Sequence, residues 1–285
     1  MEYKIFKSRR SLLFVPGNRL NLFPKALKTG ADVVCLDLED SIPSNQKAKT
    51  RRETIEFLES TSEVEDIEVV LRINGLETHD GIKDIDCIMD SKTPPSSLML
   101  TKIRSADEVR LLDKLLSTPV LSEIRFQVII ETTSALEKVM GIATACDRID
   151  SLLFGGVDMA AELGTTFDWE SMLYSRSRIV HAGASANIDI MDVPSLDIDD
   201  LAGLEKTSEA SAKLGFTGKA AIHPSQVPII NKAFTPDPKM VAEAKKIIGI
   251  FEKSENGIAV VDGKLLEKPL IRSMYRTLAL SERNK

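Results

Sequence analysis

The feature that most constrains the fold is a regular alternation of short apolar runs with longer amphipathic segments. Most of the short runs lack polar alternation, which is typical of strands covered on both faces in a parallel sheet. The segments between them carry helical periodicity, for example at 106–116, 199–214 and 238–251. Successive units of strand and then helix predict an α/β protein with a closed TIM (β/α)8 barrel. The runs lie at residues 11–15, 32–38, 69–73, 98–101, 126–130, 151–154, 188–191 and 219–222.

An open doubly wound sheet is the alternative architecture. It favours a glycine-rich phosphate-binding turn after the first strand, but PGNR stands there at residues 16–19. Gly155 and Gly156 follow a later strand and lack the remaining glycine of that motif. We therefore expect residues 1–235 to form a barrel catalytic domain. Residues 236–285 should form a C-terminal extension of helices and a hairpin, which packs on the barrel or on a neighbouring subunit.

Composition excludes several classes of partner. The 285 residues include 37 Lys and Arg against 43 Asp and Glu, a net charge of −6, which disfavours nucleic-acid binding. No apolar stretch approaches the roughly 20 residues that cross a bilayer, and the N-terminus has no signal pattern, so we expect no membrane association. Cys35, Cys87 and Cys146 lie far apart, as reduced thiols do in a cytoplasmic protein.

Charged residues stand where most of the predicted strands end. In barrel enzymes the chemistry lies at these carboxyl ends of the strands. Several carboxylates and two cations on one rim are hard to explain as core packing, because unpaired buried charges are costly. The charged and titratable residues at these positions are Asp37, Glu39, Asp40, Arg72, Lys102, Glu131, Asp158 and His223.

Glu131 and Asp158 come from consecutive strands, so their carboxylates are expected to meet above the barrel. Two hard oxygen ligands with open positions suit Mg²⁺. A zinc site is disfavoured, because none of the three histidines has a histidine partner four residues on. The alternative is that Glu131 and Asp158 form rim ion pairs with Arg72 or Lys102.

The two cations of the rim each have two interpretations. Arg72 offers a planar fork of donors for a substrate carboxylate or a developing enolate, or it forms a salt bridge to Asp37 or Glu39; both can hold together. Lys102 could form a Schiff base in a metal-free aldolase, but the candidate metal carboxylates favour a solvated or ion-paired lysine. His223 is interpreted as a hydrogen-bonded structural residue rather than a catalyst.

An ordered set of motifs covers nearly the whole chain and resembles one enzyme family. Together they resemble the citrate lyase beta-subunit-like branch of the HpcH/HpaI aldolase family, which includes malyl-CoA and citramalyl-CoA lyase-like proteins. The motifs are RSLLFVPG (10–17), LDLEDS (36–41), LRINGL (71–76), IET (130–132), FGGVD (154–158), LYSRS (173–177), IHPSQ (222–226) and VDGK (261–264).

The resemblance implies a TIM barrel that uses a divalent metal, usually Mg²⁺, to cleave or form a C–C bond in a 3-hydroxyacyl thioester. Coenzyme A is the carrier in stand-alone members, and an acyl carrier protein in the citrate lyase complex. By position, Glu131 and Asp158 match the family's metal ligands and Arg72 its substrate- and enolate-binding arginine. The resemblance also implies a trimer or hexamer, in which a C-terminal carboxylate reaches a neighbour's active site.

The sequence departs from the family pattern at three places. The family commonly has D-G-K-M-[IV]-D-x-P, whereas residues 262–269 read DGKLLEKP and place Glu267 where the catalytic Asp is usual. The longer side chain matters because catalytic geometry is sensitive to about 1 Å. In TKIR at 101–104, Arg104 stands where the family usually has a glutamate. In ETTSA at 131–135, Ala135 stands where the family usually has a glycine. These changes are expected to retune the acyl or CoA pocket.

The predicted reaction is a retro-aldol cleavage of citramalyl-, malyl- or citryl-CoA to acetyl-CoA and a 2-oxo acid. Arg72 and the metal, held by Glu131 and Asp158, stabilise the enolate, and Glu267 of a neighbouring chain protonates the acetyl carbon. Asp37, Glu39 and Asp40 are expected to orient Arg72 or metal-bound waters. The alternatives are a citrate lyase beta subunit acting on citryl-acyl carrier protein within its complex, a thioesterase or condensing enzyme, and a non-catalytic barrel protein.

Overall fold

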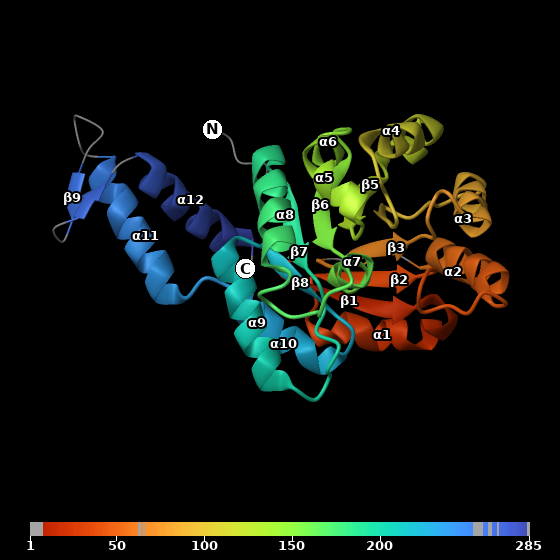
Figure 1. The fold of residues 1–285 in the computed structure, drawn as a ribbon, viewed down its shortest axis with the longest axis horizontal. Helices are drawn as coiled ribbons and strands as arrows, with labels where there is room; N and C mark the ends of the chain where they lie inside the picture. Colours follow the sequence, from red (N-terminus) through yellow and green to blue (C-terminus); the bar gives the residue numbers. More distant parts are fainter. Residues whose placement is uncertain are drawn as a thin grey trace. The chain divides into compact units, whose positions relative to one another are not determined.

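The computed structural model describes residues 8–61, 64, 66–252, 259–261, 264–266 and 268–283 (Figure 1). The chain divides into two compact units. The larger is Arg9–Asn231, and the smaller includes the chain from Lys232 onward. Within the described ranges, no helix is both long and apolar enough to span a membrane.

The larger unit is a closed barrel of eight parallel strands in chain order, in which β1 pairs with both β2 and β8. The predicted TIM barrel is therefore confirmed, with strands at the predicted positions. They are β1 (Ser11–Pro16), β2 (Val33–Asp37), β3 (Glu68–Arg72), β4 (Ser97–Leu100), β5 (Arg125–Ile130), β6 (Ile149–Phe154), β7 (Asp189–Asp192) and β8 (Gly218–Ala221).

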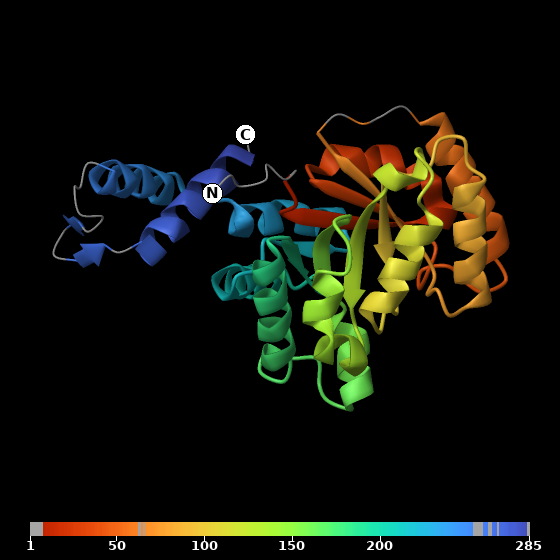
Figure 2. The same ribbon diagram turned by 90° about the horizontal axis from the view of Figure 1, so that it is seen from above.

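Helices surround these strands (Figures 1 and 2). Local signals set several of their ends. The Thr78 hydroxyl accepts the N–H of Gly81 at the start of α3, and Asp200 caps α9 in the same way. Gly215 ends α9 with φ +117°, a conformation that favours glycine. The helices are α1 (Phe23–Ala26), α2 (Lys47–Ser60), α3 (His79–Met89), α4 (Ala106–Leu115), α5 (Thr133–Glu137), α6 (Val139–Ala143), α7 (Gly156–Leu163), α8 (Leu173–Ala186), α9 (Leu201–Leu214) and α10 (Val227–Phe234).

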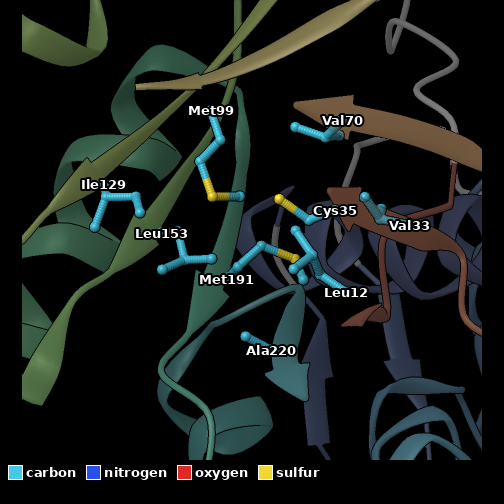
Figure 3. Close-up of a cluster of buried hydrophobic side chains, with 9 residues drawn as sticks. All are labelled: Leu12, Val33, Cys35, Val70, Met99, Ile129, Leu153, Met191 and Ala220. Carbon is cyan, nitrogen blue, oxygen red and sulfur yellow. The ribbon is translucent and has the colours of Figure 1, made fainter. Parts of the chain in front are cut away.

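An apolar layer fills the middle of the barrel (Figure 3). All eight strands contribute to it, and none of its members is more than 3% exposed. Because side chains alternate across a strand, the residues two positions further along point the same way and arrive at the carboxyl rim. The layer consists of Leu12, Val33, Cys35, Val70, Met99, Ile129, Leu153, Met191 and Ala220.

A buried ionic network closes the amino-terminal end of the barrel. Arg9 Nε lies 2.6 Å from Glu68, and its terminal nitrogens lie 3.1 Å from both Asp150 and Asp189. Gln127 donates to Glu68 at 3.0 Å. Since this end is filled by paired side chains, the opposite rim is the end at which a substrate can enter.

The smaller unit contains α11 (Pro238–Phe251), an antiparallel hairpin of β9 (Ala259–Val261) with β10 (Lys264–Leu266), and α12 (Lys268–Arg283). Asp237 caps α11 by accepting the N–H of Lys239 at 2.6 Å. An apolar cluster joins the two helices: Ile247, Ile248, Phe251, Ile271, Met274 and Leu278. Helices and a hairpin were expected here, with a boundary at 235/236 where the structure divides at 231/232. What the extension packs on stays a prediction.

Candidate active site

The carboxyl rim of the barrel gathers charged side chains from five consecutive strands. Asp37 and Arg72 end β2 and β3, and two positions earlier Cys35 and Val70 belong to the apolar layer. Glu131 follows Ile129 of the layer in the same way. Because side chains two positions apart on a strand point the same way, these three charged side chains lie over the barrel axis. Lys102 follows β4, and Asp158 lies in the first turn of α7, directly after β6.

A cavity of about 450 Å³ opens among these residues. One part of its lining is polar, with Asp37, Asp40, Ser41, Arg72, Glu131 and Asp158. The remainder is largely apolar: Phe14, Pro16, Ile129, Leu153, Phe154, Val157, Val193, Pro194, Leu196 and Ile222, with Gly155. A ligand that fits this lining has a charged or polar end and an apolar portion.

Arg72 is held in one orientation by two carboxylates. Its Nε and Nη2 each donate to Asp37 at 2.6 Å, and Nη1 lies 3.1 Å from Glu39. Burial raises the pKa of Asp37, but Arg72 and the hydrogen bonds from Ser41 and Glu39 lower it by more, so the net shift is downward. Asp37 is therefore ionised, and both salt bridges that the sequence suggested for Arg72 are present.

Glu39 lies between the two cations of the rim. It pairs with Arg72, and its Oε1 lies 3.8 Å from Lys102 Nζ. Burial raises the pKa of Glu39 to about 8 against the opposing charge of Arg72, and the neighbouring carboxylates of Asp40 and Glu131 add to the rise.

Glu131 and Asp158 both contact Lys102. The backbone N–H of Lys102 donates to Glu131 Oε1 at 2.6 Å, and its Nζ donates to Glu131 Oε2 at 3.2 Å and to Asp158 Oδ1 at 2.6 Å. Burial lowers the pKa of Lys102, but the Asp158 hydrogen bond and the surrounding carboxylates raise it more. Lys102 is thus an ion-paired lysine, which is the interpretation that the sequence favoured.

The donor set of Glu131 and Asp158 fits a divalent metal. Their oxygens reach one cation, the Lys102 ammonium, from two consecutive strand ends. In the part of the chain that the structure describes, no group of three or more His, Cys, Asp or Glu side chains is arranged to hold an ion. Two carboxylates, with water or substrate oxygens completing the shell, are typical of protein-bound Mg²⁺. The alternative ion pair with Lys102 is present in the structure, and metal ligation by the same carboxylates stays a prediction.

Gly155 is needed to seat Glu131. A Cβ added at Gly155 would lie 2.3 Å from the Cβ of Glu131 and 2.9 Å from Ile129 Cγ2. The residue therefore lets the strand end of β6 approach that of β5 closely. In the sequence, Gly155 stands out only as part of an incomplete nucleotide-binding motif and of a family motif, and its packing role was not predicted. The signal was a glycine directly after a strand, beside a candidate ligand on the preceding strand.

Two other predicted site residues lie away from this cluster. His223 is exposed, and its Nδ1 lies 2.7 Å from the Ser225 hydroxyl and accepts the Ser225 N–H at the start of the short helix η4 (Pro224–Gln226). This agrees with its interpretation as a hydrogen-bonded structural residue. Glu267, the predicted proton donor, lies outside the described residues.

A second buried ionic cluster lies outside the barrel wall and was not predicted. Asp192 of β7 accepts from Lys219 Nζ at 3.0 Å, from Arg176 Nε of α8 at 3.1 Å and from the Ser211 hydroxyl at 2.6 Å. Burial raises the pKa of Asp192, but the two cations lower it more. Met191 and Ala220 face the core, so Asp192 and Lys219 point the other way, towards the helices.

A TIM barrel whose carboxyl rim joins an oriented arginine to two convergent carboxylates has the arrangement of a lyase that stabilises an enolate. The chain belongs to the HpcH/HpaI aldolase/citrate lyase family, whose family model matches residues 10–224. The resemblance of its motifs is thereby confirmed.

Named relatives and a solved structure extend this similarity over most of the chain. The human mitochondrial citramalyl-CoA lyase is 28% identical over 96% of this chain and 85% of its own. An L-malyl-CoA/beta-methylmalyl-CoA lyase of Cereibacter sphaeroides is 32% identical over 92% of this chain and 91% of its own. The crystal structure of CitE from Mycobacterium tuberculosis with magnesium, acetoacetate and coenzyme A is similar with a TM-score of 0.81 and 26% identity, over 98% of this chain and 99% of that one.

Proposed function

We propose that this protein is a Mg²⁺-dependent carbon–carbon lyase that cleaves a 3-hydroxyacyl-CoA thioester to acetyl-CoA and a 2-oxo acid. Citramalyl-, malyl- and citryl-CoA are the candidate substrates. The observation that carries the proposal is the convergence of Glu131 and Asp158 on one cation beside the oriented guanidinium of Arg72. The lyase names of its relatives and the magnesium and coenzyme A in the CitE structure support it.

Each charged residue of the rim has a role in this reaction. Glu131 and Asp158 would hold Mg²⁺, which supplies a Lewis acid that polarises substrate oxygens. Arg72 donates hydrogen bonds to the thioester oxygen, where negative charge develops as the C–C bond breaks. Asp37 and Glu39 fix the guanidinium plane, so that Arg72 does not reorganise during the reaction. Arg72 and Glu131 are also the substrate-binding residues that we propose.

The apolar lining of the cavity supports the same chemistry. Val157, Pro194, Leu196 and Ile222 face the cavity that the charged residues line. A bound acyl group would displace water from this lining. With less water present, the hydrogen bonds from Arg72 to a developing enolate are stronger.

When the C–C bond breaks, the substrate hydroxyl loses a proton and the acetyl carbon gains one, so the reaction needs an acceptor for the first proton and a donor for the second. We propose Glu267 of a neighbouring copy as this donor, in a homotrimer or hexamer that the C-terminal extension helps to assemble. The compartment that we propose is the cytoplasm. It agrees with three free cysteines, of which Cys35 is buried and Cys87 and Cys146 are half-buried.

A second candidate is a subunit that performs the same cleavage on citryl-acyl carrier protein within a citrate lyase complex. It is favoured by the citrate lyase subunit beta of Leuconostoc mesenteroides subsp. cremoris, which is 29% identical over 97% of this chain and 94% of its own. A requirement for carrier protein, or co-purification with partner subunits, would distinguish it from the stand-alone enzyme.

The test is an assay of 2-oxo acid release from a panel of 3-hydroxyacyl-CoA esters with Mg²⁺. Glu131→Gln and Asp158→Asn are expected to lower turnover at least about hundredfold and to weaken Mg²⁺ binding, with an unchanged circular dichroism spectrum. Asp86→Asn, on the exposed face of α3, is the matched control. Full activity in both site variants would refute the proposal, and CoA release without a 2-oxo acid would indicate a thioesterase.

A further inference from the structure

Lys102 is a cation of the rim that the proposed reaction does not use. Its Nζ lies 2.6 Å from Asp158 Oδ1, 3.2 Å from Glu131 Oε2 and 3.8 Å from Glu39 Oε1. Two of these three carboxylates are the proposed metal ligands. An ammonium group and a divalent ion are attracted to the same oxygens, so contact with one weakens contact with the other.

The backbone of Lys102 adopts a conformation that aims it at these carboxylates. Met99 faces the apolar layer, so strand alternation would place Thr101 rather than Lys102 over the barrel. Lys102 instead has φ +56°, in the left-handed region that is unfavourable for a lysine. In this conformation both its backbone N–H and its Nζ donate to Glu131. A strained backbone of this kind persists only where surrounding contacts hold it, and here the two hydrogen bonds to Glu131 do so.

The surroundings of Lys102 make its charge matter. The lysine side chain is 24% exposed and that of Glu131 is 2% exposed, so solvent screens this pair little. Without a cation between them, the carboxylates of Glu131 and Asp158 would repel each other. Glu39, whose Oε1 lies 3.8 Å from Lys102 Nζ, is a third acceptor for the ammonium when Glu131 and Asp158 bind a metal.

We propose that Lys102 and the divalent cation compete for Glu131 and Asp158, so that Lys102 sets the metal affinity of the site. The ammonium holds the two carboxylates together when no metal is bound, and moves towards Glu39 when Mg²⁺ binds. Lys102 is thus a positioning residue that preorganises the ligands and lowers their affinity for Mg²⁺. This inference rests on the proposed function for the identity of the metal ligands.

Calorimetric titration of MgCl₂ into the full chain, without substrate, tests the competition. Lys102→Met is expected to bind Mg²⁺ about tenfold or more tightly than the wild type. Lys102→Arg, which keeps the charge, should stay near the wild-type value. Lys83→Met is the control, because it removes one positive charge from the exposed face of α3, and it should change the affinity less than about twofold.

The outcomes separate the two proposals. If the wild type binds Mg²⁺ and Lys102→Met binds it equally or more weakly, the competition is wrong while the proposed lyase stands. If neither protein binds Mg²⁺, both proposals are wrong.

Thermal unfolding gives a second measurement that needs no tight binding. In EDTA, Lys102→Met should melt below the wild type, since Glu131 and Asp158 lose their counter-charge. Addition of MgCl₂ should raise its melting temperature more than that of the wild type. Lys102→Gln serves in the same comparison if the Met variant does not fold. Equal shifts on Mg²⁺ addition would overturn the inference.

Discussion

Replacement of Asp37 by asparagine removes the charge that orients Arg72 and leaves the shape of the side chain almost unchanged. Asp37 accepts four hydrogen bonds: two from Arg72 at 2.6 Å, one from the Glu39 N–H at 2.8 Å and one from the Ser41 N–H at 3.1 Å. An asparagine keeps one oxygen acceptor and turns an N–H₂ donor towards another donor. The variant therefore leaves a largely buried guanidinium without its main partner.

The expected cost follows from this geometry. Breaking a buried ion pair from one side costs about 3–5 kcal/mol. Glu39 remains 3.1 Å from Arg72, which places the loss at the lower end, about 3 kcal/mol. For a unit of this size, about 2–4 °C of melting temperature is lost per kcal/mol, so Asp37→Asn should melt about 6–12 °C below the wild type.

The assay is urea and thermal unfolding followed by circular dichroism, with 2-oxo acid release measured on the same samples. Asp86→Asn is the matched control, because Asp86 forms only an exposed pair with Lys83 at 3.8 Å, and such pairs contribute about 0–1 kcal/mol. A loss of stability below about 1 kcal/mol for Asp37→Asn would refute the reasoning.

The difference in stability between the wild type and Asp37→Asn should change with pH in a defined direction. The pKa of Asp37 is lower in the folded protein than its ordinary value of about 3.9. The ion pair therefore contributes its full stability above that ordinary value, and the contribution is lost as the pH falls through the folded pKa. The difference in unfolding free energy between the wild type and Asp37→Asn should therefore decrease below about pH 4.

Three further substitutions test the packing beside Glu131, the buried ion pairs of Asp192 and the role of Arg72. Gly155→Ala places a methyl group 2.3 Å from the Glu131 Cβ, so it should cost about 1–3 kcal/mol of unfolding free energy and weaken the Mg²⁺ binding measured by calorimetry. Gly141→Ala, where the added methyl group would lie 3.9 Å from the Ala106 Cβ, should do neither. Asp192→Asn leaves buried Lys219 and Arg176 without their shared carboxylate and should cost about 3–5 kcal/mol in urea unfolding; a loss like that of Asp86→Asn would contradict the ionic cluster. Arg72→Lys loses the planar fork, so turnover should fall about 10²-fold or more while Mg²⁺ affinity stays the same; a parallel loss of metal binding would show that Arg72 acts through the metal.

The fold could be predicted because its signal is periodic and local. Each buried strand appears as a short apolar run, and the strand order of a barrel follows the chain. The rim residues Asp37, Arg72 and Glu131 also follow from the sequence, since each stands two positions after a core residue on its strand. These elements need no knowledge of tertiary contacts.

The ionic partners on the rim could not be assigned in the same way. The sequence leaves open whether Arg72 or Lys102 pairs with Glu131, because the choice depends on a backbone torsion of Lys102. The φ of +56° at Lys102 reverses the direction that strand alternation gives it. No neighbouring glycine or turn motif announces this conformation at TKIR.

The outer cluster of Asp192, Lys219 and Arg176 escaped prediction for a different reason. Lys219 lies within a run read as a buried strand, where a lysine is unexpected, and its partner Arg176 comes from a helix. Pairing between a strand and a distant helix requires the helix to be docked first. In the sequence, Arg176 stands out only as part of the family motif LYSRS at residues 173–177.

The apolar layer in the middle of the barrel separates two electrically distinct ends. Arg9 and its three carboxylates lie below it, and Arg72 and the metal-binding candidates lie above it. Groups that share no partners contribute to stability almost additively. Loops and side chains above the layer can therefore diverge to accept a different acyl group, while the buried ionic network of Arg9 keeps the barrel closed. The same Arg9 network is compatible with related enzymes that differ in the acyl group they accept.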